Sequence, residues 1–422
     1  MTSDRILVSV RLFEFPSFAG LDEGPLAAFM FKKKQLEATI SGLFDYFNTR
    51  FQLYGRRLEP FFWEGKGDIA AEAQGAGQEG AEADGVKVAD EIKPFAELLA
   101  LTNPYADALA RRQVMNFGAL YMPREWYAAR RPYSWSSTPD CTFVMESVSD
   151  YLLKRVARKP ASHAGGDLHD QARRLALIAP ENAEYQSCVD DGERVLRSAG
   201  APPALRLAYK LDFNTLSNQA ASIVAKLRSA RITTVVCGCD PVLPLFLTDK
   251  AHEQTYEPEW VIVGSPFIDN DSFGQVYQQD QWSRAFGLSW SGRLQPVRST
   301  YGYFAFKAMR PHDEPIALVD ALYYNLYPLA LGIQMAGPHL TPETFETGLY
   351  TWAGATGPAG TWRFSPGRYD PIQDGREIYW DPDRTSPFNG NKGTYVESEP
   401  GRRYGAGEWP SGEPPAYRGR GG

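Results

Sequence analysis

The sequence predicts an α/β protein built as two Rossmann-like lobes joined by crossover segments, with an irregular, β-containing extension at the C-terminal end. The main observation is a set of four short apolar runs in the middle of the chain, each of which leads into an amphipathic stretch. Such runs, bounded by turn residues, are typical of strands buried on both faces of a parallel sheet. The second observation is an earlier series of strands and helices of the same kind. The four runs lie at residues 175–179, 205–211, 232–237 and 260–264.

Length and composition indicate a folded protein with more than one domain. The chain has 422 residues, of which 43% are hydrophobic. A chain of this length is too long for one ordinary hydrophobic core. The net charge of −7 and the scattered basic residues give no support to a nucleic-acid partner. No apolar stretch approaches the ~20 residues that a membrane span needs. The first residues resemble a strand rather than an export signal, which leaves a start further upstream and a true absence of a signal both open.

The first part of the chain predicts alternating strands and helices. A long amphipathic helix lies between two strand-like runs, and a loop rich in Gly and Ala leads to a helix whose apolar face carries Val88 and Ile92. A strand, a helix and a further strand complete this series. In chain order, we expect a strand at 6–13, a helix at 25–48, a strand at 58–63, a loop at 64–79, a helix at 82–93, a strand at 95–100, a helix at 105–111 and a strand at 114–118.

Aromatic residues are concentrated in the connecting segment 121–140, which indicates either the core of a domain junction or a wall that faces a ligand. After the central repeat, a helix that is apolar almost all round is expected to be buried. A shorter helix begins with Thr341 as N-cap and Pro342 at its first position. The remaining expected elements are a helix at 142–156, a loop at 157–171, an irregular stretch at 281–303, helices at 315–336 and 341–349, strands at 360–364 and 377–380, and a loose tail at 398–422.

The four cysteines, Cys141, Cys188, Cys237 and Cys239, are too few and too widely placed for a disulfide-dense scaffold. Two interpretations stay open: one disulfide in an exported protein, or buried small side chains in a cytosolic one. Their spacing predicts no metal site.

Motifs of common enzyme classes are missing from the sequence. There is no G-x-S-x-G elbow, no G-x-x-x-x-G-K-[ST] phosphate loop and no G-x-G-x-x-G that follows a strand and opens a helix. Cys239 lies on a strand-end loop near a helix start, where a thiol can be activated, but no histidine is recognisable as its base. The sequence therefore predicts no catalytic residue and no cofactor.

Several motifs, taken in order and spacing, resemble those of the type I periplasmic binding proteins of the leucine-binding, branched-chain amino-acid family, which are the receptors of ABC importers. The resemblance covers most of the chain, from residue 43 to residue 358. The motifs are Asp45-Tyr46-Phe47-Asn48 with Leu53-Tyr54-Gly55-Arg56-Arg57, Ala176-Leu177-Ile178-Ala179 with Ala183-Glu184-Tyr185, Asp212-Phe213 before Ala225-Lys226-Leu227, and Tyr327-Pro328-Leu329-Ala330 with Ile333 and Ala336-Gly337.

The resemblance implies a clamp of two lobes that closes around a small ligand without covalent chemistry. The first lobe is expected at 1–138 and 312–358, and the second lobe at 139–311. A C-terminal extension with short strands is expected at 359–397, followed by a flexible tail at 398–422.

In the first lobe, the family holds the ligand carboxylate with hydroxyls and backbone amides of a loop that matches residues 101–105 of this chain. Thr102, Asn103 and Tyr105 are therefore candidate ligand contacts, and the helix that begins here favours an anion. Helix capping by Thr102 or Asn103 is the alternative interpretation.

In the second lobe, Tyr185 matches the family's aromatic ligand contact, and packing at a helix start is the alternative. The loop with Cys239 and Asp240 matches the place where the family receives the ligand's ammonium group, unless Asp240 only caps the next helix. Val242 stands where amino-acid binders have an acid, which argues against an amino-acid ligand. Tyr121, together with Trp135, is a further candidate for the wall of the cleft.

The sequence therefore predicts a solute-binding receptor of an ABC-type importer, specific for an amino acid, an amide or a related acid. We expect a monomer whose partners are the solute and the permease subunits, with no metal and no nucleic acid. An extracytoplasmic location is expected if the start lies upstream, and a cytoplasmic location stays open. The alternatives are a sensing module of the same fold and an α/β enzyme that uses the loops around Cys239 and Asp240.

Overall fold

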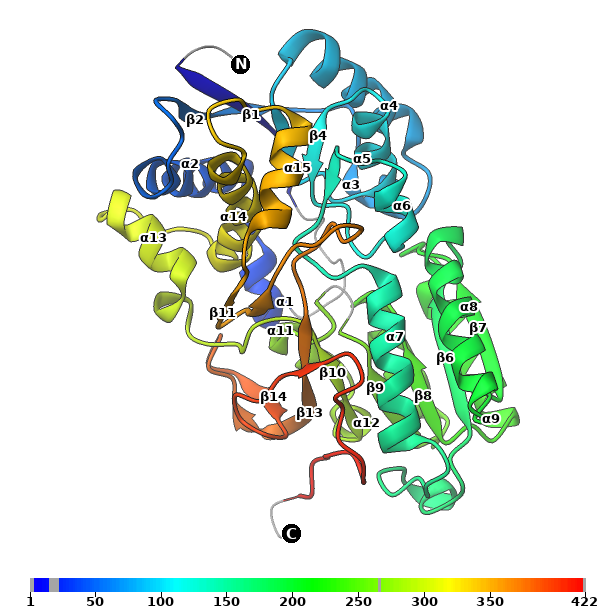
Figure 1. The fold of residues 1–422 in the computed structure, drawn as a ribbon. Helices are drawn as coiled ribbons and strands as arrows, with labels where there is room; N and C mark the ends of the chain where they lie inside the picture. Colours follow the sequence, from blue (N-terminus) through cyan, green and yellow to red (C-terminus); the bar gives the residue numbers. More distant parts are fainter. Residues whose placement is uncertain (1–3, 15–22, 265–266, 420–422) are drawn as a thin grey trace. The chain divides into compact units, whose positions relative to one another are not determined.

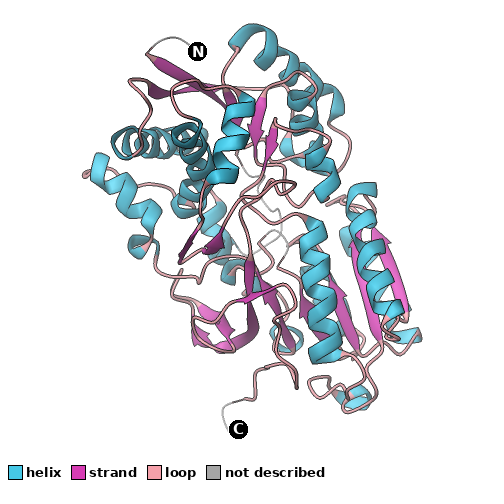
Figure 2. Ribbon diagram, in the orientation of Figure 1, coloured by secondary structure: helices cyan, strands magenta, loops and turns pink. Residues whose placement is uncertain are grey.

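The computed structural model describes residues 4–14, 23–264 and 267–419. The chain divides into two compact units, each of which alternates strands with helices (Figures 1 and 2). The α/β class expected from the sequence is confirmed. Unit 1 consists of Met1–Asp140, Gln295–Thr356 and Thr361–Ile372, and unit 2 consists of Cys141–Leu294, Gly357–Gly360 and Gln373–Gly422.

Unit 1 is built on a parallel sheet of five strands in the order β2-β1-β3-β4-β5. The side chains of Ile6, Val8 and Val10 are fully buried, as the place of β1 between two neighbours requires. The strands are β1 (Arg5–Arg11), β2 (Arg57–Trp63), β3 (Ala96–Leu98), β4 (Met115–Phe117) and β5 (Ser134–Trp135).

The helices of unit 1 pack in two groups. Helix α2 contacts α13 and α14, α14 contacts α15, and α4 contacts α5. The predicted cap at Thr341 is confirmed, because its hydroxyl accepts a hydrogen bond from the Thr344 amide at 3.2 Å. The helices are α1 (Glu23–Leu26), α2 (Lys33–Arg50), α3 (Ile69–Ala73), α4 (Gln78–Lys87), α5 (Asn103–Ala110), α6 (Arg124–Ala128), α13 (Tyr301–Met309), α14 (Val319–Ala336) and α15 (Pro342–Thr351).

Unit 2 contains a larger mixed sheet in the order β14-β13-β10-β9-β8-β6-β7, with β15 paired to β13. The four predicted apolar runs form β6, β7, β8 and β9, which are parallel to one another. Three of these strands are fully buried, and β7 is partly exposed because it lies at the edge. The strands are β6 (Leu175–Pro180), β7 (Leu205–Tyr209), β8 (Thr234–Cys237), β9 (Glu259–Ile262), β10 (Ala285–Ser289), β13 (Asp374–Thr385), β14 (Lys392–Glu397) and β15 (Tyr404–Gly405).

Two disulfides lie in unit 2, where the sequence left at most one open. Cys141–Cys188 joins the start of α7 to the body of α8, and these helices pack against each other, whereas Cys237–Cys239 closes the end of β8. The helices of this unit are α7 (Cys141–Tyr151), α8 (Ala183–Ser198), α9 (Leu216–Ser229), α10 (Leu243–Glu253), α11 (Asp271–Gly274) and α12 (Gln279–Trp282).

Two strands lie where the sequence predicted irregular structure. The connecting segment 121–140 contains β5, which is only two residues long, and the stretch 281–303 contains β10. A glycine interrupts the apolar pattern of β10, and the structure requires it: a Cβ on Gly287 would lie 2.2 Å from the carbonyl oxygen of Ile262. The loop expected at 64–79 also contains a short helix, α3.

The C-terminal part of the chain belongs largely to unit 2. Two short strands, β11 (Ala355–Gly357) and β12 (Gly360–Trp362), precede it. The long strand β13 pairs antiparallel with β10, so the extension expected at 359–397 continues the sheet. The tail, expected to be loose, lies against unit 2 through buried Trp409, whose ring contacts Tyr151, and through Glu413, which pairs with Arg173 at 3.3 Å. Each of these contacts joins a single side chain to a partner far away in the sequence. A local sequence pattern cannot predict contacts of this kind.

Candidate functional site

The candidate ligand residues follow the carboxyl ends of the parallel strands. In unit 1, Thr102 comes after β3 and Tyr121 after β4; in unit 2, Tyr185 comes after β6, and Cys239 and Asp240 come after β8. Loops at the carboxyl ends of parallel strands are the usual place for ligands in open α/β sheets. The structure therefore places these candidates near the carboxyl edge of their own sheets.

The loop after β3 is held by internal contacts. The Thr102 hydroxyl donates a hydrogen bond to the Glu72 carboxylate at 2.5 Å, and its side chain makes no capping bond to α5. Asn103 opens α5 and is half-buried. Tyr105 is fully buried, and its ring lies 3.8 Å from the Arg11 guanidinium. Thr102 and Tyr105 thus contact a buried polar cluster.

That cluster, which we call the Arg11 cluster, consists of Arg11, Glu72, Asp84 and Glu97. Glu72 binds the Arg11 guanidinium through both oxygens, at 2.7 and 2.8 Å, and Asp84 binds it at 2.9 Å. The Arg11 side chain is only 3% exposed. Burial lowers the pKa of Arg11 and the Glu72 carboxylate raises it, with a net upward shift. The backbone of the 64–68 loop closes over the cluster, since a Cβ on Gly67 would lie 2.1 Å from Glu72.

Glu97 is the third carboxylate of the Arg11 cluster, and its donors are a hydroxyl and a backbone amide. It accepts hydrogen bonds from the Ser9 hydroxyl and, at 2.8 Å, from the Arg11 amide. Its side chain is fully buried, and this burial raises the pKa of Glu97 to about 7. The hydrogen bonds of the Arg11 guanidinium go to Glu72 and Asp84, and the buried Glu97 carboxyl keeps its proton below neutral pH.

The stability of the chain is therefore expected to fall with rising pH because of Glu97. Below its unfolded value of about 4.5 the group is protonated in both states, and between about 4.5 and 7 only the folded state keeps the proton. Between pH 4.5 and 7.5, Glu97 is expected to lower the free energy of unfolding of the wild type by ~3 kcal/mol. The Glu97→Gln variant is neutral at every pH, so we expect it not to show this decrease. Urea unfolding at these two pH values measures it. The exposed Glu37→Gln is the matched control, and an identical pH dependence in the two variants would contradict the assignment.

In unit 2, Asp240 is engaged on both carboxylate oxygens. One oxygen accepts from the amides of Val242 at 2.7 Å and Leu243 at 3.2 Å, at the start of α10. The other accepts from the Tyr209 hydroxyl at 2.6 Å. Burial raises the pKa of Asp240. The contacts favour the capping interpretation of Asp240, because no oxygen is left without a donor.

Tyr209 is not among the residues that the sequence predicts for the site. Its hydroxyl also accepts the Asp240 amide at 2.9 Å, so it ties the end of β7 to the loop after β8. Tyr185, the third residue of α8, lies at the adjacent strand end and is half-buried, and burial raises its pKa to about 12. The sequence feature that could have identified Tyr209 is its position: it places a hydroxyl group at the end of the apolar run that forms β7. Tyr185, Tyr209 and Asp240 together form the polar edge of unit 2.

Cys239 is bonded to Cys237 and is not a thiol in this structure. A catalytic cysteine acts as a thiolate, so the disulfide removes Cys239 as a nucleophile. The enzyme alternative that rested on this residue loses its leading group.

The two aromatic candidates of the connecting segment differ in environment. Trp135 is fully buried against Phe345, Phe364 and Tyr369, so the core interpretation of this residue is confirmed. Tyr121 follows β4 with a positive φ of 55° and is 9% exposed. Tyr121 remains a prediction as a ligand contact.

Comparisons with known proteins identify the fold. No model of a known protein family matches the chain, and no curated protein matches it in sequence. Among the described residues, no helix combines the length and apolar character needed to cross a bilayer.

Solved structures of ABC transporter solute-binding proteins match almost the whole chain. One from R. palustris, in complex with 4-hydroxybenzoate, has a TM-score of 0.64 and 12% identity, covering 96% of this chain and 99% of that one. One from Aeropyrum pernix has a TM-score of 0.64 and 16% identity, covering 96% of both chains. A branched-chain amino acid transporter substrate binding protein from Streptococcus pneumoniae, in complex with isoleucine, has a TM-score of 0.59 and 13% identity, covering 93% of this chain and 100% of that one. The resemblance indicated by the sequence motifs is thus confirmed at the level of the fold, which is that of the type I periplasmic binding proteins.

Proposed function

We propose that the chain is a solute-binding receptor of an ABC-type importer, which binds a small organic solute without converting it. The observation that carries this proposal is the similarity of fold over nearly the full length of both chains. Reversible binding needs no cofactor and no catalytic group, and Cys239, the leading nucleophile of the enzyme alternative, is in a disulfide. The polar loops at the carboxyl edges of the two sheets supply the contacts.

The contacts of Asp240 bear on the class of solute. Amino-acid receptors need an acid that receives the ammonium group, and Val242 cannot supply one. Asp240 has both oxygens filled by Tyr209 and by the start of α10. We therefore propose an organic acid or amide without a free ammonium group, with the Tyr185 ring as an apolar contact. The complexes with hydroxybenzoates among the structural neighbours are of this chemical class.

The two disulfides support an extracytoplasmic location. Disulfides persist in oxidising compartments and are rare in the cytosol, where thiols are kept reduced. Both bonds are buried in unit 2, and all four cysteines take part in them. We propose that the protein acts as a monomer outside the cytoplasm and delivers its solute to permease subunits.

A thermal-shift screen tests the proposal. A solute at a hundred times its Kd stabilises the folded chain by about 2.7 kcal/mol, which raises the melting temperature by a few degrees. We expect aromatic acids such as 4-hydroxybenzoate, or related acids and amides, to give such a shift, and leucine and isoleucine to give a smaller one. Tyr185→Ala is expected to reduce the shift, whereas Tyr301→Ala, an exposed tyrosine on α13, leaves it unchanged. A panel of these classes with no shift in any member would contradict the receptor proposal.

A further inference from the structure

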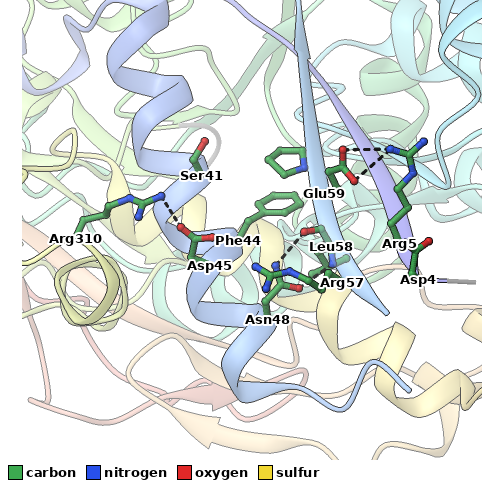
Figure 3. Close-up of a pocket in the computed structure, with 11 residues that line it drawn as sticks. Asp4, Arg5, Ser41, Phe44, Asp45, Asn48, Arg57, Leu58, Glu59 and Arg310 are labelled. Atoms are coloured by element: carbon green, nitrogen blue, oxygen red, sulfur yellow. Dashed lines mark hydrogen bonds and ion pairs between the residues drawn. The ribbon is translucent and has the colours of Figure 1, made fainter. Parts of the chain in front are cut away.

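A polar cavity lies in unit 1, at the opposite end of the strands from Thr102. It has a volume of about 670 Å³ and is lined by residues from α2, from the starts of β1 and β2, and by Arg310 after α13 (Figure 3). Arg5 and Arg57 are the first residues of β1 and β2 and are partners in the parallel register. The cavity is therefore at the amino edge of the sheet, separate from the carboxyl-edge loops, so a role for it is independent of the receptor function proposed above.

Three arginines line this cavity, and two of them are paired with carboxylates. Arg310 contacts Asp45 at 2.5 Å, and Arg5 contacts Glu59 at 3.4 Å (Figure 3). Within the described part of the chain, no ion pair or hydrogen bond engages the guanidinium of Arg57. Arg5 also has N–H groups that do not contact Glu59, because only its Nη1 bonds to that carboxylate.

The backbone holds Arg57 in place. Its amide donates to the Asp4 carbonyl at 3.0 Å. The next residue, Leu58, exchanges two hydrogen bonds with the side chain of Asn48, at 2.8 and 2.9 Å, which fixes β2 against α2. In Figure 3 the Arg57 side chain extends towards α2, whereas Asp4, the third carboxylate of the wall, lies beside Arg5. A cation on a fixed backbone loses less freedom on binding than one on a mobile loop.

The chemistry of the lining fits an oxyanion. A free guanidinium presents planar N–H pairs that bind carboxylate or phosphate oxygens through two hydrogen bonds. Phe44, Leu58 and Pro60 also line the cavity and contribute apolar surface, so the cavity suits the organic part of a ligand as well as its charged group. Its volume lies in the range of sites for small molecules. We propose that this cavity is a second ligand site, which binds a small organic anion through a carboxylate or phosphate group on Arg57.

Anion binding to purified protein tests this proposal. Inorganic phosphate and acetate are titrated by calorimetry at constant pH and ionic strength, and the tighter of the two identifies the head group. We expect Arg57→Gln to weaken binding about tenfold. Arg293→Gln, which removes the same charge from an exposed position in unit 2, is expected to leave binding unchanged.

A variant that is expected to bind the anion more tightly distinguishes a direct effect on binding from a loss of binding caused by unfolding. Asp45→Asn removes the carboxylate that neutralises Arg310, so we expect it to tighten anion binding severalfold while the melting temperature stays close to that of the wild type. The proposal is overturned if neither anion binds, or if Arg57→Gln and Arg293→Gln have equal effects. Weaker anion binding by Asp45→Asn would also overturn the proposal, because removing a negative charge from the cavity wall can only favour an anion.

Discussion

Loss of the Cys141–Cys188 disulfide is expected to lower the free energy of unfolding by about 4 kcal/mol, against ~1.5 kcal/mol for loss of Cys237–Cys239. The cause is the length of chain that each bond closes, because their cysteines are 47 and 2 residues apart. A cross-link that closes a longer loop removes more conformational entropy from the unfolded chain. Urea unfolding of the double variants Cys141→Ala/Cys188→Ala and Cys237→Ala/Cys239→Ala, without reductant, measures the two values.

The two double variants control for each other. All four cysteines are buried, so each variant loses a similar amount of packing, and the difference between them reports loop closure. Equal destabilisation would mean that chain entropy is not what the longer bond contributes. The small expected effect of Cys237–Cys239 suggests that its role is local, at the loop that leads from β8 to Asp240.

The second large effect is expected at the Arg11 cluster. Arg11→Met leaves the carboxylates of Glu72 and Asp84 buried without their cation, and breaking a buried pair in this way costs about 3–5 kcal/mol. The substitution also removes the contact with the Tyr105 ring. We expect unit 1 to unfold at a markedly lower urea concentration at pH 7.

Arg5→Met is the matched control for Arg11→Met. It lies on the same strand and also loses an ion pair, with Glu59, but both side chains are 49% exposed. Such a pair contributes less than about 1 kcal/mol. If the two substitutions were equally costly, burial of the Arg11 cluster would not be the source of its stabilising effect.

The strands could be predicted from the sequence wherever burial on both faces produces a continuous apolar run. The strands β6, β8 and β9 lie in the interior of their sheet, so all of their residues are buried and most of them are apolar. The strands β5 and β10 were missed, because two residues carry no period and Gly287 breaks the run that contains it. The tail was missed because Trp409 and Glu413 are held by partners in distant segments.

The candidate site was predicted only as far as the strand ends. Thr102 and Asp240 are at the carboxyl edges as expected, because strand direction and order determine this. Which group each side chain contacts depends on partners such as Glu72 and Tyr209, which lie 30 and 31 residues away in sequence. The sequence therefore predicts the position of the loops, whereas the structure decides which of their side chains are already engaged.

Calorimetric titration of the compound that gives the largest thermal shift, followed by recovery and mass analysis of that compound, tests the receptor account most directly. We expect one equivalent of the compound to bind per chain and the compound to be unchanged after prolonged incubation. A converted product, or the absence of saturable binding by any acid or amide, would contradict it.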